Sequence, residues 1–147
     1  MRYVLIGALA ARLQGFPRIT SDADITPERE QVNLGKLAAA LRELQAKVFT
    51  DSVPSGLPFS CTAENLKQSG MWKLVTSAGR IDIAFTPAGT KGYDDLIKNA
   101  VKFDVFDTIV YTSSLQDIIR LKKAADRPQD RQDVIVLKEM LERRSGS

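Results

Sequence analysis

The stretch that decides the fold begins Tyr3-Val4-Leu5-Ile6-Gly7-Ala8 and ends Ile19-Thr20-Ser21-Asp22-Ala23-Asp24-Ile25. Tyr3–Ile6 is a short apolar run that stops at Gly7, which is typical of a strand followed by a turn. The residues after the turn predict a short helix over Ala8–Leu13 that ends at Gly15. Ile19–Ile25 then alternates small or apolar side chains with polar ones, which predicts a second strand.

The second predicted strand carries two carboxylates. Side chains two residues apart on a strand lie on the same face, so Asp22 and Asp24 should point the same way, roughly 6–7 Å apart. Ala23 and Ile25 would then point into the core. Two carboxylates on one face repel each other unless a cation lies between them. Such a pair is also common on a solvated strand face, and both interpretations stay open.

A third acid, Asp82, interrupts an apolar run that reads Arg80-Ile81-Asp82-Ile83-Ala84-Phe85. A buried carboxylate without a partner is costly, and one metal shared by Asp22, Asp24 and Asp82 would explain all three acids. Asp82 could equally be a surface residue of an edge strand. The chain has no histidine, which excludes Ser-His-Asp triads and His-ligated zinc. A site with oxygen ligands only favours a hard cation such as Mg²⁺.

Composition limits the class of protein. The 147 residues, 44% hydrophobic and 27% charged, predict one globular domain over 1–147, with a sheet-containing core over 1–113 and helices over 114–144. No apolar run reaches the ~20 residues of a membrane span, and the single cysteine, Cys61, fits a reducing compartment. We therefore expect a cytoplasmic protein with no membrane partner. Its formal net charge of +3 permits nucleic-acid contact without requiring it. Disorder is expected only in the tail Arg143–Ser147.

The remaining patterns predict a mixed α/β (α+β) fold, with a sheet flanked by helices and a helical pair at the C-terminus. The expected elements are a helix over Arg29–Ala46, a surface loop around Pro54, Gly56 and Pro58, a β-hairpin of Trp72–Thr76 and Arg80–Phe85, a helix over Tyr93–Ala100, one or two strands over Val101–Thr112, a helix capped by Ser114, and a last helix from Pro128 to about Arg143.

The N-terminal motifs resemble the nucleotidyltransferase superfamily of DNA polymerase β. That superfamily has a strand, a Gly-Gly or Gly-Ser turn, a short helix, an Asp-x-Asp strand and a third acid on a later strand. The resemblance covers Tyr3–Ile25 and Ile81–Ile83. It implies a minimal nucleotidyltransferase fold and a transferase that uses an NTP with Mg²⁺ or Mn²⁺. It also implies that Asp22, Asp24 and Asp82 are the catalytic metal ligands.

The turn departs from the superfamily pattern, because its second position is Ala8 where a Ser would offer a hydroxyl. The backbone N–H groups of Gly7 and Ala8 remain available to bind phosphate. Arg18 either clamps phosphate or is an ordinary surface charge. A domain of this kind often has a helix before its first strand, which here begins two residues after Met1. We therefore hypothesise that the native chain starts upstream.

The C-terminal part carries a second motif. Ser114-Leu115-Gln116-Asp117-Ile118-Ile119 is followed by Lys122, by Arg127-Pro128-Gln129-Asp130 and by Asp133. This motif resembles the signature of AbiEii-like nucleotidyltransferases, a group that includes MenT-type toxins of toxin–antitoxin systems. In one interpretation Lys122 and Arg127 bind nucleotide phosphates, and Asp133 has a catalytic role in orienting a Lys or Arg. In the other, an Asp–Lys/Arg network only holds two helices together.

The toxin resemblance also implies an acceptor and a partner. The acceptor would be the tRNA 3′ end, extended with pyrimidine nucleotides, CTP being the expected donor, so that translation is blocked. The partner would be a cognate antitoxin, and a kinase-like one would phosphorylate Thr20, placing negative charge beside the carboxylates. The alternatives are a plain strand Thr20, a small-molecule or protein hydroxyl as the acceptor, and an inactive fold that serves as a binding partner.

Overall fold

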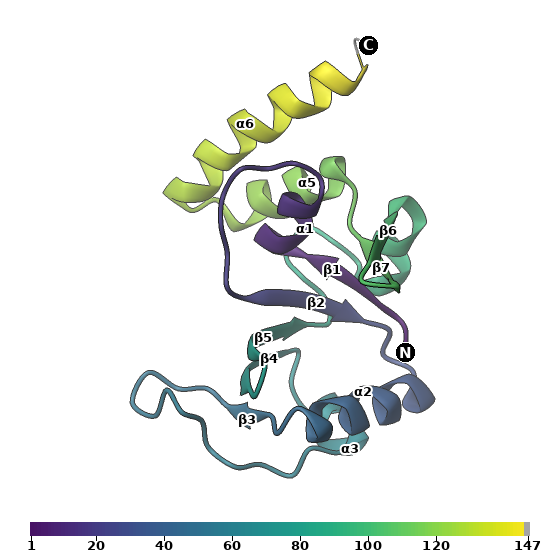
Figure 1. Ribbon diagram of the computed structural model, residues 1–147, viewed down its shortest axis with the longest axis vertical. Coiled ribbons are helices and arrows are strands. Elements are labelled where there is room, and N and C mark those ends of the chain that lie inside the picture. Colours follow the sequence, from purple (N-terminus) through teal and green to yellow (C-terminus); the bar gives the residue numbers. More distant parts are fainter. Residues whose placement is uncertain (146–147) are drawn as a thin grey trace.

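The computed structural model describes residues 1–145 and shows one mixed sheet with helices around it (Figure 1). The seven strands follow the order β3-β4-β5-β2-β1-β7-β6 across the sheet. Their bounds are β1 (Tyr3–Ile6), β2 (Ala23–Pro27), β3 (Lys47–Val48), β4 (Met71–Thr76), β5 (Gly79–Ala84), β6 (Val101–Val105) and β7 (Thr108–Thr112). The mixed α/β architecture predicted from the sequence is confirmed.

Two parallel contacts join the three parts of the sheet. β1 and β2 are antiparallel neighbours, β4 and β5 form one hairpin, and β6 and β7 form another. The first hairpin joins the centre through the parallel pair β2–β5, and the second joins it through the parallel pair β1–β7. Strands far apart in the sequence therefore meet in the middle of the sheet.

The helices cover both faces of this sheet. Their bounds are α1 (Gly7–Leu13), α2 (Gln31–Glu43), α3 (Ala63–Lys67), α4 (Tyr93–Leu96), α5 (Leu115–Ala125) and α6 (Pro128–Ser145), with a 3₁₀ turn over Ile97–Asn99. Leu5 and Ile25 pack with α2 in the main core, whereas Val4 and Ile6 pack with Leu96 of α4. Neighbouring residues of β1 thus point to opposite faces, as strand geometry requires.

Most predicted elements are present, with four differences. The second strand begins at Ala23, not at Ile19, whose side chain is exposed. β3 and α3 were not predicted. The predicted helix over Tyr93–Ala100 shortens to α4 and the 3₁₀ turn.

The C-terminal tail is the fourth difference, because α6 runs on to Ser145. Arg143–Ser145 are therefore helical, not disordered as predicted. Positions 146 and 147 lie outside the described residues. No helix within residues 1–145 is long and apolar enough to cross a membrane.

Candidate active site

Two of the predicted carboxylates lie side by side on the central parallel strands. Asp24 on β2 is the register partner of Asp82 on β5. Register partners on adjacent strands point to the same face of a sheet, and this is the face opposite the main core. Asp22 precedes β2 and lies near enough to Asp24 to add to the repulsion at its carboxylate. The fold therefore gathers the acids of two stretches that are far apart in the sequence.

Asp24 is the most strongly perturbed acid of the site. Burial, followed by the charges of Asp82 and Asp22, raises the pKa of Asp24 to about 6, while Lys122 and Arg127 oppose that rise. Gly7 lies directly against this side chain with φ +72°, and a Cβ there would come within 2.6 Å of the Asp24 carboxylate. A glycine at position 7 is therefore required both by the backbone and by the space that Asp24 occupies.

A cavity of about 440 Å³ opens in front of Asp24. Gly7 and Asp24 line it together with Lys122, Arg127 and Asp130. The remaining lining residues are apolar, namely Ile6, Met71, Ala84, Pro87, Ala88, Leu121 and Ala125. An apolar wall with a few convergent charges is the usual character of a small-ligand site. Cations and a carboxylate in one cavity suit a ligand that carries phosphates and a bound metal ion.

The cations of the cavity belong to a network between α5 and α6. Lys122 Nζ lies 2.9 Å from Asp133 Oδ2 and 3.6 Å from Asp130 Oδ1. Gln129 donates to Asp133 Oδ1 at 3.1 Å, and Arg18 forms an ion pair with the same carboxylate. Burial alone would raise the pKa of Asp133, but hydrogen bonds from Lys122 and Gln129 outweigh burial and lower it. The predicted Asp–Lys/Arg network is thus present, and its Lys122 also lines the cavity.

Arg127 reaches the cavity from the turn before α6. Its Nε lies 2.7 Å from Asp130 Oδ2, and Asp130 is almost fully buried while the Arg127 side chain is 74% exposed. Burial would raise the pKa of Asp130, but hydrogen bonds from the side chain and backbone of Arg127 lower it. An ionised, buried Asp130 holds one side of the guanidinium and leaves most of it accessible to a ligand.

Arg80 was not identified from the sequence. Its Nη2 lies 2.8 Å from Asp82 Oδ1, and its guanidinium stacks over the Phe49 ring at 3.7 Å. Lys73 on β4 is the register partner of Asp82. The signal for Arg80 was present, because residues 80 and 82 lie two apart on one strand and share a face.

The three carboxylates do not form a preformed metal-binding site. Within residues 1–145, no group of three or more Asp, Glu, His or Cys side chains is arranged to hold a metal ion. One oxygen of Asp82 is engaged by Arg80, and Asp22 accepts a hydrogen bond from Ser21 at 3.3 Å. The carboxylate oxygens of these three residues are nevertheless the kind of ligand that Mg²⁺ prefers. A cation would also relieve the repulsion from Asp82 and Asp22 that adds to burial in raising the pKa of Asp24.

Two further predicted residues lie at the edges of this site. Ala8 is in the first turn of α1, directly after Gly7. The Thr20 hydroxyl accepts a hydrogen bond from the Asp22 backbone N–H at 3.3 Å. Thr20 is therefore attached to the backbone that positions Asp22.

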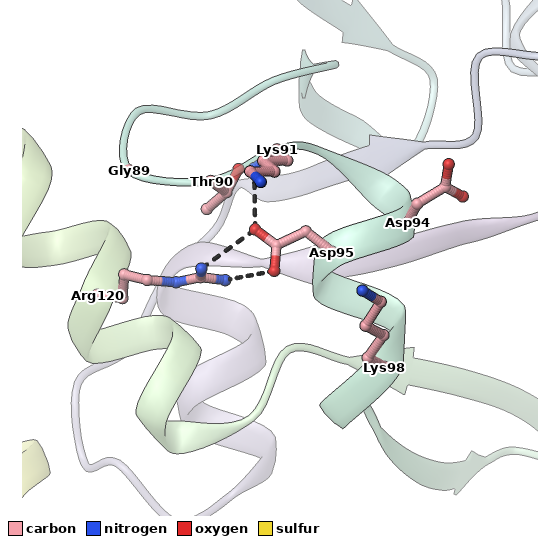
Figure 2. A pocket seen from close by; sticks show the side chains of 7 residues that line it. All are labelled: Gly89, Thr90, Lys91, Asp94, Asp95, Lys98 and Arg120. Carbon is pink, nitrogen blue, oxygen red and sulfur yellow. Dashed lines mark hydrogen bonds and ion pairs between the residues drawn. The ribbon is translucent and has the colours of Figure 1, made fainter.

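A second cavity, of about 580 Å³, is lined by the loop between β5 and α4, by α4 and by Arg120 of α5 (Figure 2). Its central acid, Asp95, accepts a hydrogen bond from the Lys91 backbone N–H at 2.9 Å and pairs with Arg120 at 3.1 Å. Arg120 also pairs with Asp117 at 3.1 Å. These charged groups pair with one another and connect the loop to α5. None of the predicted site residues lines this cavity.

The chain was compared with known proteins. No protein-family model and no curated protein matches the sequence. Solved structures that share its fold include the following two. The lincosamide antibiotic adenylyltransferase LnuA, solved with lincomycin bound, is 16% identical with a TM-score of 0.57, over 94% of this chain and 86% of LnuA.

The second solved structure is a candidate nucleotidyltransferase (TM1012) from Thermotoga maritima. It is 18% identical with a TM-score of 0.54, and the match covers 97% of this chain and 83% of that protein. Both likenesses extend over nearly the whole chain, and both are likenesses of fold. The chain therefore has a nucleotidyltransferase fold, as the sequence predicted.

Proposed function

We propose that this chain is a metal-dependent nucleotidyltransferase that moves a nucleoside monophosphate from an NTP to a hydroxyl group and releases pyrophosphate. One observation carries the proposal. Asp24, with Asp82 in register beside it, shares one cavity of a nucleotidyltransferase fold with Lys122 and Arg127. Carboxylates that can hold a divalent cation, together with cations that can hold phosphates, are the groups that phosphoryl transfer needs.

Each residue has a defined part in this proposal. Asp22, Asp24 and Asp82 would hold Mg²⁺ or Mn²⁺, which supplies charge neutralisation at the triphosphate when bound. Lys122 and Arg127, which line the same cavity, would bind phosphate oxygens.

The supporting residues position these groups. Gly7 leaves the space that the Asp24 carboxylate occupies, and the backbone N–H groups of Gly7 and Ala8 would bind phosphate. Asp133 orients Lys122 and Arg18 through its two carboxylate oxygens. Catalysis then rests on positioning and electrostatics.

The test is transfer of label from each of four α-labelled NTPs to a mixture of acceptors in the presence of Mg²⁺. Asp24→Asn and Asp82→Asn should each abolish transfer while the thermal unfolding transition persists. Asp51→Asn is the matched control, because Asp51 is an exposed loop residue away from the cavity. Full transfer by Asp24→Asn would show that the site assignment is wrong.

For the acceptor we propose the tRNA 3′ end, with CTP as the donor, in a toxin controlled by a cognate antitoxin. Support comes from the C-terminal motif, whose Lys122, Arg127 and Asp130 line the same cavity as Asp24, and whose Asp133 pairs with Lys122. Label that appears on the 3′ end of tRNA supports this acceptor, and growth arrest on expression supports the toxin role.

We also propose that phosphorylation of Thr20 by a kinase-like antitoxin switches this activity off. Its hydroxyl is hydrogen-bonded to the backbone of Asp22, so a phosphate there adds negative charge beside the site. Thr20→Glu should reduce transfer, whereas Thr20→Ala should not. A fully active Thr20→Glu variant would contradict the switch.

A second acceptor class is a hydroxyl of a small molecule. The observation that favours it is the likeness to LnuA, which is described as a lincosamide antibiotic adenylyltransferase. The same labelling assay separates the two classes, because label on a small molecule supports this second class. Label on protein indicates a protein hydroxyl, and no label on any acceptor indicates an inactive binding partner.

A further inference from the structure

β6 forms one edge of the sheet, and its outer side pairs with no other strand of residues 1–145. Its hairpin with β7 closes through the pair Val105–Thr108 around Phe106 and Asp107, which have φ values of 51° and 64°. Two central residues with positive φ make the tight hairpin turn whose closing pair is joined by backbone hydrogen bonds. Val105 therefore directs its backbone groups inward, toward β7.

The outward backbone groups of β6 then belong to Lys102 and Asp104, because alternate residues of a strand direct these groups to opposite sides. The alternation of backbone directions along β7 leads to the same assignment. Ser113, just after β7, donates its backbone N–H to Leu5 of β1 at 2.9 Å, so Thr112 faces the other way, toward Val101. Lys102 and Asp104 thus present unpaired donors and acceptors along an open edge.

The sequence of β6, Val101-Lys102-Phe103-Asp104-Val105, is complementary to itself. In an antiparallel pair of two copies centred on Phe103, Lys102 of each copy lies opposite Asp104 of the other. Both are outward residues, so these pairs are also the ones that exchange backbone hydrogen bonds. Centring on Lys102 or on Asp104 keeps the hydrogen bonds but places like charges opposite each other, which is destabilising. Of these three registers, only the one centred on Phe103 both exchanges backbone hydrogen bonds and places opposite charges across from each other.

Exposed apolar side chains surround this edge. Phe106 at the hairpin tip is 98% exposed, Ile109 and Tyr111 on β7 are exposed by 45% and 41%, and Val101 is exposed by 37%. A monomer usually protects an open edge with charge. Here the two charges are complementary under a twofold axis, and the apolar residues beside them offer surface to bury.

We propose that β6 pairs antiparallel with β6 of a second copy of this chain, centred on Phe103, so that the two sheets join in a twofold-symmetric dimer. The interface is isologous, with each Lys102 opposite the Asp104 of the other copy. Phe103 meets its own counterpart across the axis, and the apolar tip at Phe106 extends along the second copy.

The experiment is analytical ultracentrifugation of the full chain over a wide range of concentrations. Wild type should sediment as a dimer. Lys102→Asp and Asp104→Lys each place like charges opposite each other at two symmetric positions, and each should weaken the dimer by at least roughly tenfold. The double variant Lys102→Asp/Asp104→Lys should recover the wild-type dimer.

A mixture of the two single variants gives the sharpest result. One chain then carries two acids and the other two lysines, so the mixture should form a heterodimer although neither variant dimerises well alone. Lys47→Asp, at the exposed opposite edge of the sheet, is the matched control and should remain dimeric. Circular dichroism confirms that each variant is folded. A monomeric wild type, or single variants that dimerise like wild type, would overturn the proposal.

Discussion

At the scale of single residues, Gly7 leaves the space beside its backbone that the Asp24 side chain occupies. A Cβ at position 7 would lie 2.6 Å from Asp24 Oδ2, and the backbone there has φ +72°. Gly7→Ala should therefore lower the free energy of unfolding by about 1–3 kcal/mol and strongly reduce NMP transfer. Chemical unfolding and the transfer assay measure the two effects.

The control for this substitution is another glycine of the same chain. A Cβ at Gly35, within α2, would meet no atom within 4 Å. Gly35→Ala should stabilise the protein by about 0.5–1 kcal/mol, because alanine is the better helix former, and should leave transfer unchanged. Equal losses at the two positions would mean that Gly7 has no special relation to Asp24.

Asp24 makes the stability of the folded chain depend on pH. Burial, then Asp82 and Asp22, raises the pKa of Asp24 from 3.8 to about 6, so the folded state binds its proton more tightly than the unfolded state does. The stabilising contribution of the protonated group is complete below pH 3.8, declines as the pH rises toward 6, and is absent above that. In metal-free buffer above pH 6, Asp24→Asn should exceed wild type in stability by up to about 3 kcal/mol.

Urea unfolding of both proteins across this pH range measures the difference. The two stabilities should converge below the ordinary pKa of an aspartate, where both side chains are neutral. A constant difference between the two proteins at every pH would contradict the electrostatic origin of the effect.

At the scale of elements, capping and turn residues predicted where α5 and α6 begin, although α3 was missed despite its cap Thr62. Ser114 accepts the Asp117 backbone N–H at 3.1 Å and begins α5, as expected, and Pro128 begins α6. β3 was missed because it has only two residues and pairs with Leu74 and Val75 of β4, which are distant in the sequence. Alternation predicted β2 too long, because Ile19 alternates with its neighbours without being buried.

The contact between α5 and α6 depends on one buried acid. The Asp133 side chain is 5% exposed and pairs with Lys122, whose side chain is 13% exposed. Asp133→Asn leaves the poorly solvated ammonium with the more distant Asp130 as its remaining ionised partner, so the free energy of unfolding should fall by about 3 kcal/mol. Glu139→Gln on the same helix is the control, because its pair with Arg143 is exposed and spans 3.7 Å. The control should lose less than about 0.5 kcal/mol in the same urea titration, and equal losses would contradict a buried role for Asp133.

At the scale of the whole molecule, the order of the strands is what the sequence could not predict from its local patterns. Asp24 and Asp82 become neighbours only because β5 docks parallel to β2, a contact between residues about 58 positions apart. The resemblance to a known superfamily predicted this meeting, and local periodicity did not. The i, i+2 spacing of Arg80 and Asp82 indicated their pairing, but the place of Arg80 in the site depends on Asp82 lying beside Asp24.

The assembled site predicts that the metal ion and the nucleotide stabilise the whole molecule together. Asp22, Asp24 and Asp82 repel one another without a cation, whereas Lys122 and Arg127 attract phosphates in the same cavity. Mg²⁺ with a non-hydrolysable NTP analogue should therefore raise Tm by more than the sum of the two separate shifts. The analogue at a concentration about a hundred times its Kd should add about 2.7 kcal/mol to the free energy of unfolding.

Asp82→Asn should lose the Mg²⁺-dependent part of the Tm shift, and the control variant Asp51→Asn should keep it. Differential scanning fluorimetry measures both shifts. Because this readout needs no acceptor, strictly additive shifts in wild type would count against the shared site itself, whatever hydroxyl the enzyme modifies.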